Sequence, residues 1–183
     1  MRVISGTARG LKLVTPEGLS TRPTLDRVKE ALFSMVAPQL RGAAVLDLFA
    51  GSGALGIEAL SRGAERAVFV DSSKDARAAV LKNLENSRLY EKSRIESGDA
   101  LGFLSSCTDS FDLIFMDPPY EAGLYEAVLR LIAEKGLLAP DGIISVEWDE
   151  TMGEPDFPGC FIRERDRHYG RVHITLLKTE TRR

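Results

Sequence analysis

Residues 117–120, Asp-Pro-Pro-Tyr, directly follow an apolar run and carry the most distinctive chemistry in the sequence. The apolar run at 111–116 is typical of a buried strand, and open parallel sheets bind ligands at the C-terminal ends of their strands. Two consecutive prolines remove two backbone N–H donors but leave every carbonyl acceptor in place. The sequence therefore predicts a rigid, donor-poor corner with an aromatic face, suited to a flat ring that carries N–H groups.

Such a corner fits the exocyclic amine of a nucleobase, which is a poor nucleophile because its lone pair is delocalised into the ring. The Asp117 carboxylate and the Pro118 carbonyl are expected to accept the amine hydrogens and direct the lone pair at an electrophile. Tyr120 is expected to stack on the ring, an interaction worth about 1–3 kcal/mol per base. Taken alone, these residues also allow a simpler interpretation, a Pro-Pro stop after a buried strand with an incidental Asp.

A second motif lies upstream, where residues 51–56 contain the spacing Gly-x-Gly-x-x-Gly between a predicted strand and a predicted helix. Gly51 and Gly53 allow a tight turn and the close approach of a ligand, and Asp71 ends the next strand, where it can bond ribose hydroxyls. This arrangement predicts a site for an adenosine-containing cofactor. The alternative is a glycine turn that serves only helix–strand packing.

The loop alone does not decide between cofactors, because NAD sites share this spacing. Asp47 favours S-adenosylmethionine, since a negative charge at the passage from strand to loop repels a pyrophosphate but attracts an ammonium or a sulfonium cation. Asp99 ends the third predicted strand, where it is placed to accept a hydrogen bond from an adenine amino group. An aspartate in such a position is also often a simple turn residue.

Strands and helices alternate from residue 43 onward, and these elements must position the two motifs. The alternation predicts a mostly parallel sheet with helices on both faces, and a closing hairpin adds antiparallel edge strands. We therefore predict an α/β, Rossmann-like, doubly wound fold with a seven-stranded sheet. The predicted strands are 43–50, 65–71, 94–100, 111–116, 142–148 and the two halves of 160–178 around Tyr169-Gly170, and the predicted helices are 54–63, 74–89 and 124–136.

The first 41 residues differ in character, so we divide the chain into an N-terminal extension, 1–41, and an α/β domain, 42–183. The extension is basic and broken by Gly and Pro until 24–36, which has the spacing of a helix that packs on the domain.

Residues 1–41 and 162–183 each hold seven Lys or Arg against three Asp or Glu, so each end has a net charge of +4. Since the net charge of the whole chain is −3, the middle of the chain carries −11. A basic rim on an acidic body could hold a polyanion such as nucleic acid, although solvated surface charge is the simpler alternative.

The composition, 44% hydrophobic and 28% charged, is ordinary for a globular protein. The N-terminus lacks the apolar core of a signal peptide and no stretch is long enough to span a membrane, so we expect no membrane partner. Cys107 and Cys160 are isolated and without metal-like spacing, so we expect a reduced, cytoplasmic protein without a metal. We also expect a monomer.

The combined motifs resemble a known family. LDLFAGSGALGIEALSRGA at 46–64 with DPPY at 117–120 looks like the class I S-adenosylmethionine-dependent amino-methyltransferases. RVISGTARGLKL at 2–13 and RPTLDRVKEALFSMV at 22–36 narrow the resemblance, over nearly the whole chain, to the RsmD family of bacterial 16S rRNA guanine-N2 methyltransferases. The resemblance implies methylation of the N2 amine of one guanine, of the guanine-966 type, in the small ribosomal subunit or an assembly intermediate.

Transferred residue by residue, the resemblance implies a complete site, in which the target guanine is extruded into the pocket. The cofactor residues are Asp47, Phe49, Gly51, Ser52, Gly53, Asp71, Ser72, Asp99 and Ala100, the target-base residues are Asp117, Pro118, Pro119 and Tyr120, and the RNA-phosphate contacts are Arg9, Lys12, Arg22 and Arg27. Arg22 and Arg27 could equally pair with acidic groups of the α/β domain.

Three other functions stay open. A DNA adenine-N6 or cytosine-N4 methyltransferase could use the same corner, although 183 residues leave no room for a separate sequence-reading domain. The intact pair of motifs argues against a non-catalytic RNA-binding protein that retains the fold, and Asp47 argues against an NAD oxidoreductase. The chain also departs from the family at 171–178, RVHITLLK, where an aromatic-rich end is common, so the role of the C-terminal hairpin in RNA contact stays open.

Overall fold

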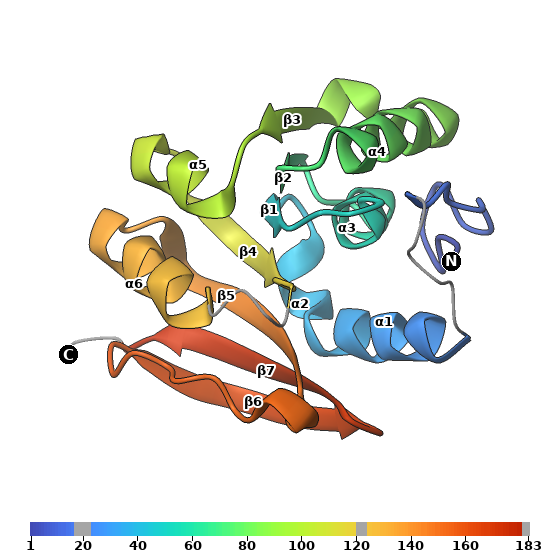
Figure 1. Ribbon diagram of the computed structural model, residues 1–183. Helices are drawn as coiled ribbons and strands as arrows, with labels where there is room; N and C mark the ends of the chain where they lie inside the picture. Colours follow the sequence, from blue (N-terminus) through green and yellow to red (C-terminus); the bar gives the residue numbers. More distant parts are fainter. Residues whose placement is uncertain (17–22, 120–123, 181–183) are drawn as a thin grey trace.

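The computed structural model describes residues 1–16, 23–119 and 124–180, which form a seven-stranded sheet flanked by helices (Figure 1). The strand order is β3-β2-β1-β4-β5-β7-β6, with β1 to β5 parallel and β7 antiparallel to both β5 and β6. This confirms the predicted Rossmann-like fold with its antiparallel hairpin. The strands are β1 (Ala44–Leu48), β2 (Arg66–Asp71), β3 (Ser93–Ser97), β4 (Phe111–Met116), β5 (Leu138–Asp149), β6 (Phe161–Tyr169) and β7 (Val172–Thr179).

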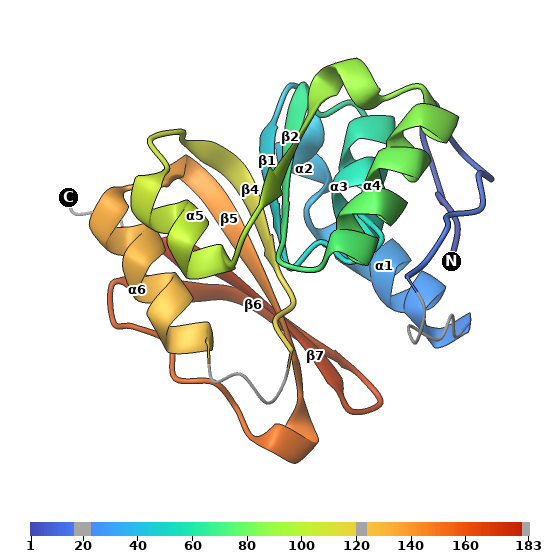
Figure 2. The same ribbon diagram turned by 45° about the horizontal axis from the view of Figure 1, so that its top comes forward.

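Two groups of helices cover opposite faces of the sheet, as Figure 1 and Figure 2 both show. One face carries α1 (Pro23–Met35), α2 (Ala37–Leu40), α3 (Ala54–Ser61) and α4 (Lys74–Ser87), and the other carries α5 (Ala100–Ser106) and α6 (Tyr125–Lys135). Two short 3-10 helices, η1 (Tyr90–Lys92) and η3 (Glu150–Met152), complete the elements of the described residues. None of these described helices has the length and apolar character needed to cross a lipid bilayer.

Alternate residues of the central strands supply the two cores. Val45 of β1 and Phe115 of β4 pack under the α1–α4 group, whereas Leu46 and Ile114 pack under α5 and α6. All four side chains are fully buried, and burial of a side chain of this size contributes about 1.5–3 kcal/mol. Because side chains alternate along a strand, a polar residue in this pattern points to one defined face of the sheet.

The order of the strands creates a switch point beside β1. From β1 the chain builds outward through β2 and β3, and it then returns to the other side of β1 as β4. In open α/β sheets, ligands bind outside the carboxyl ends of the strands at such a point. The described residues of both sequence motifs, 47–56 and 117–119, lie at these carboxyl ends of β1 and β4.

Several limits of elements differ from the sequence prediction, and the strand predicted at 94–100 ends at Ser97 as β3. The helix α5 was not predicted, because ALGFLSS is too short to show a helical repeat, and its start depends on Asp99, whose Oδ1 accepts the N–H of Gly102 at 2.8 Å. The strand β5 begins at Leu138 rather than at 142, since Leu138 already pairs with Phe111 across an irregularity in the register.

The N-terminal segment, 1–16, lies against α3 and shares the core of the sheet. Val3 and Leu13 are buried in the same core as α1 and α3, and an isolated antiparallel bridge joins Arg2 to Lys12. The backbone of the segment is held by Glu58 of α3, as described below. The division of the chain at residue 41 stays a prediction.

Candidate active site

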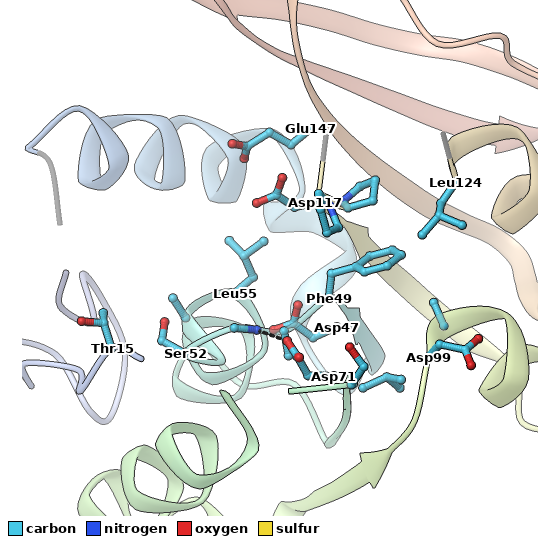
Figure 3. Close-up of a pocket in the computed structure, with 18 of the residues that line it drawn as sticks. Thr15, Asp47, Phe49, Ser52, Leu55, Asp71, Asp99, Asp117, Leu124 and Glu147 are labelled. Atoms are coloured by element: carbon cyan, nitrogen blue, oxygen red, sulfur yellow. Dashed lines mark hydrogen bonds between the residues drawn. The ribbon is translucent and has the colours of Figure 1, made fainter. Parts of the chain in front are cut away.

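A pocket of about 740 Å³ opens at the carboxyl ends of β1, β2, β4 and β5, where the switch point predicts a ligand. It runs from the loop before α5, past the glycine loop, to α1 and the end of β5. Figure 3 shows Asp71 and Asp99 toward one end of this space and Asp117 and Glu147 together at the other. The cavity is large enough for a cofactor together with a flat ring.

Carboxylates from three neighbouring strands point to the same face of the sheet. Asp47 pairs in register with Phe69 of β2 and Phe115 of β4, and Asp71 and Asp117 lie two residues further along those strands. Since side chains two residues apart share a face, all three carboxyl groups project into the pocket, with Asp47 one layer deeper.

The glycine loop is held from below by Asp71. The Oδ2 atom of Asp71 accepts the N–H of Gly51 at 2.8 Å, and its Oδ1 accepts that of Ser73 at 2.8 Å. Each oxygen retains a further lone pair for a hydroxyl, so the expected ribose contact is compatible with both bonds. Ser72 and Ala100, two residues predicted for the cofactor site, also line the pocket.

Three residues of the loop adopt left-handed backbone angles. Gly51 and Gly53 have φ of 57° and 74°, which glycine adopts without strain, and Phe49 has φ of 60°, which is rare for a side chain of this size. Phe49, Gly51 and Ser52 line the pocket. Gly53 instead lies beneath the loop, where a Cβ would contact Phe69 and Val80 at 3.2 Å, so its place in the structure is one of packing.

Asp47 is almost fully buried, and its Oδ2 accepts the N–H of Gly56 at 2.8 Å. Burial raises the pKa of Asp47 to about 8, with smaller contributions from the charges of Asp117 and Asp71, while the bond from Gly56 acts in the opposite direction. A cation in the pocket would favour the charged form.

Asp99 has two roles in the structure. Its carboxylate caps α5 through Gly102, and its side chain is nevertheless exposed and lines the pocket. The turn role that the sequence left open is thus present, and it leaves the second carboxylate oxygen available.

The predicted acceptor corner faces the pocket. Asp117, Pro118 and Pro119 all line it, whereas Tyr120 lies outside the described residues. Water reaches Asp117 through the open mouth of the pocket, but protein atoms crowd its carboxyl group, and this desolvation raises the pKa to about 6.

Glu147, which the sequence analysis missed, is the fifth carboxylate among the described residues that line the pocket. Desolvation raises the pKa of Glu147 well above its usual range, and the charge of Asp117 adds to the effect. The signal was present in the sequence, because the predicted strand 142–148 contains one carboxylate in an otherwise mostly apolar run, at the end where ligands bind.

Lys29 of α1 is a second missed residue of the pocket wall. Its ammonium group is almost fully buried, lies 3.1 Å from Oε2 of Glu58 and donates to the carbonyl of Arg2. Glu58, fully buried, also accepts the N–H groups of Ile4 and Ser5 at 2.8 and 3.0 Å and pairs with Arg62 at 2.7 Å. This cluster joins α1, α3 and the N-terminal segment behind the pocket.

The residues expected to contact RNA phosphates lie outside the pocket lining. Arg9, Lys12 and Arg27 are exposed, and within the described part of the chain none of them forms an ion pair. The suggested pairing of Arg27 with an acid of the domain is therefore not seen there. Arg22 lies outside the described residues.

Comparisons with known proteins give consistent matches along the chain. A family model described as "Conserved hypothetical protein 95" matches residues 1–178. The chain is 37% identical over 180 residues to "Ribosomal RNA small subunit methyltransferase D" of Escherichia coli (strain K12), covering 98% of this chain and 90% of that protein. It is 41% identical over 181 residues to YlbH of Bacillus subtilis (strain 168), covering 97% and 98%. The solved structure of yhhF from Escherichia coli is similar with a TM-score of 0.90 at 35% identity, covering 100% and 99%.

Proposed function

This chain belongs to the family of "Conserved hypothetical protein 95", the RsmD family that its sequence resembles, and on that premise we propose that it methylates the N2 amine of a guanine in 16S rRNA. The methyl donor is S-adenosylmethionine, and the target is of the guanine-966 type. The substrate is the small ribosomal subunit or an assembly intermediate, and the protein acts as a monomer.

The observation that carries this proposal is one pocket that joins a carboxylate-lined cofactor end to the acceptor corner. Among its described lining residues Lys29 is the sole Lys or Arg, and Glu58 already holds its ammonium group. A pyrophosphate would therefore find three acids and no available Lys or Arg among these described lining residues, whereas a ligand with a sulfonium and an ammonium group suits the acids. This favours S-adenosylmethionine over NAD.

The residues of the pocket divide the work of the reaction. Asp71 is placed to accept hydrogen bonds from ribose hydroxyls, and Asp99 is placed to accept one from an adenine amino group. Asp47 is placed to interact with the positive charge of the cofactor. When bound, S-adenosylmethionine supplies an electrophilic methyl group on sulfur. At the other end, the Asp117 carboxylate and the Pro118 carbonyl accept the two hydrogens of the guanine N2 amine and favour a nitrogen whose lone pair points at the methyl group.

No strong base is needed in this mechanism. The amine nitrogen attacks before it loses a proton, and it becomes acidic only once it is methylated. Asp117 already accepts a hydrogen bond from that nitrogen and can take the proton, which leaves to solvent through the open mouth of the pocket. Catalysis then comes from positioning and electrostatics rather than from general-base strength.

Access to the amine requires extrusion of the guanine from its pairs and stacks. Arg9 and Lys12 of the N-terminal segment and Arg27 of α1 present charges without an acidic partner in the described structure, and we assign them to RNA phosphates. Tyr120 and Arg22 keep their predicted roles in base stacking and phosphate contact.

The experiment is methyl transfer from labelled S-adenosylmethionine to three substrates: small ribosomal subunits from cells that lack the gene, deproteinised 16S rRNA, and duplex DNA. Nuclease digestion and mass spectrometry of the product identify the modified base. We expect N2-methylguanine at one position of 16S rRNA. Methyladenine or methylcytosine in the DNA would instead support the DNA amino-methyltransferase, and the absence of both cofactor binding and methyl transfer would support a non-catalytic RNA-binding protein.

A further inference from the structure

We propose that Glu147 selects guanine, by accepting the N1–H of the base whose N2 amine is held at Asp117. This inference rests on the proposed function and adds to it a residue that recognises the ring rather than the reacting amine. It is drawn from the pairing of β4 with β5, from the lack of a donor to the Glu147 carboxyl group among the residues that the structure describes, and from the pattern of donors on guanine.

The two carboxyl groups are neighbours because of the strand register. Met116 of β4 pairs with Val146 of β5, so the next residues, Asp117 and Glu147, lie side by side at the ends of parallel strands. Residues paired in this way project to the same face, and adjacent strands are about 4.8 Å apart. Figure 3 shows both carboxyl groups directed into the pocket.

The backbone of Glu147 is fixed from the opposite side of the sheet. The hydroxyl of Tyr125 in α6 donates to the Glu147 carbonyl at 3.0 Å. The flanking residues Val146 and Trp148 are buried in the core under α6. The side chain of Glu147 is therefore presented to the pocket by a rigid strand end, which is a property of a built binding site.

Glu147 and Asp117 differ from the other pocket carboxylates in their partners. Asp47, Asp71 and Asp99 each accept a backbone N–H within the protein. In the part of the chain that the structure describes, no donor bonds the carboxyl group of Asp117 or Glu147. Two adjacent carboxyl groups without a donor are costly unless a ligand supplies one.

Guanine supplies donors in the required arrangement. Its N1–H and N2–H2 groups lie side by side on one edge of the ring, so a base whose amine is at Asp117 directs N1–H toward the neighbouring carboxylate. In adenine and cytosine the ring nitrogen next to the amine is an acceptor, which would face the Glu147 carboxylate with a lone pair. An N–H donor on the base also favours the ionised form of the Glu147 carboxyl group, which opposes the rise in its pKa that desolvation causes.

The test compares guanine with 2-aminopurine, a base that keeps the 2-amino group but has an acceptor at N1. Small subunits are rebuilt with 16S rRNA that carries either base at the position mapped for the wild-type protein. We expect the wild-type protein to prefer guanine by about 10–100-fold in kcat/KM, since a specific base contact is worth that much. In the Glu147→Gln variant the amide can donate to N1, so the preference should narrow or reverse.

Controls separate this inference from its premise. Calorimetry should show unchanged S-adenosylmethionine binding by Glu147→Gln. The Glu147→Asp variant keeps the carboxylate and should keep a preference for guanine. Glu134 is an exposed glutamate of α6, and Glu134→Gln should behave as the wild type. An unchanged preference in Glu147→Gln, or an equal loss on both bases, would overturn the role of Glu147. Failure of the wild-type protein to methylate guanine at all would instead overturn the proposed function.

Discussion

Asp47 at the end of β1 accepts the backbone N–H of Gly56 in α3 at 2.8 Å, and this bond ties the strand to the helix directly under the pocket. The approach is so close that a Cβ on Gly56 would lie 2.3 Å from the ring of Phe69. The third glycine of the motif therefore serves the packing of helix on strand, and the buried carboxylate of Asp47 beside it lines the pocket.

Gly56→Ala should disrupt this contact. Because the added methyl group overlaps the Phe69 ring, we expect a loss of about 1–3 kcal/mol in the free energy of unfolding, together with weaker S-adenosylmethionine binding. Denaturant titration and calorimetry measure the two effects. Gly159→Ala is the control, since a Cβ there meets nothing within 4 Å, and equal behaviour of both variants would contradict the packing role.

Asp47→Asn should stabilise the empty protein and weaken its binding of S-adenosylmethionine. The pKa of Asp47 is raised from 3.8 to about 8, so the folded protein holds a proton that the unfolded chain releases, and the contribution of Asp47 to stability is lost as the pH rises through this range. Asparagine keeps an acceptor for Gly56 but carries no charge to bury.

The measurement is the free energy of unfolding of both proteins as a function of pH. We expect the advantage of Asp47→Asn to grow between about pH 4 and pH 8, reaching about 1–3 kcal/mol. A difference that does not change with pH would show that Asp47 is not the group that titrates.

Methyl transfer should depend on the ionisation of Asp117. Its pKa of about 6 means that the carboxylate is protonated as the pH falls below that value, and a protonated group loses acceptor capacity for the amine. Under saturating cofactor and RNA, we expect the single-turnover rate constant to be flat above about pH 7 and to fall with a slope approaching tenfold per pH unit below about pH 6. An acid limb that persists in Asp117→Asn would assign the titration to another group.

Much of the fold could be predicted because it is encoded locally. The strand 111–116 was predicted with its observed limits, since six mostly apolar residues are followed by Asp117 and two prolines, and the glycine spacing located the β1–α3 turn. The sequence places a carboxylate at the end of the predicted strand 142–148, but that Glu147 lies beside Asp117 follows only from the pairing of β4 with β5. Lys29 was missed because its partner, Glu58, lies 29 positions later in the chain.

The N-terminal segment shows the same limit of local information. Its sequence suggested an extension that lies on the domain, but it did not indicate the contacts, in which Glu58 and Ser61 bind the backbone of the segment and Val3 is buried in the core. No pattern within residues 1–16 indicates these partners, because backbone N–H groups of any sequence can make such bonds.

Gly6→Ala should therefore detach the segment. A Cβ on Gly6 would lie 1.8 Å from the carbonyl oxygen of Ser61, and the φ of +85° adds strain. Gly10→Ala is a matched control, with a φ of +87° and nothing within 4 Å of the added atom. We expect the melting temperature to fall clearly further in Gly6→Ala than in Gly10→Ala, and hydrogen exchange of the Ile4 and Ser5 amides to accelerate in the former. Equal effects in the two variants would show that the segment contributes little to the fold.

The most direct test of the central claim is methyl transfer by Asp117→Ala to small ribosomal subunits under single-turnover conditions, with S-adenosylmethionine binding measured on the same sample. Because the Asp117 carboxylate is one of the two proposed acceptors of the acceptor corner, we expect a rate constant lower by about 10²–10³-fold or more, with a cofactor affinity close to that of the wild type. Near-normal transfer by this variant would contradict the claim that Asp117 holds the reacting amine.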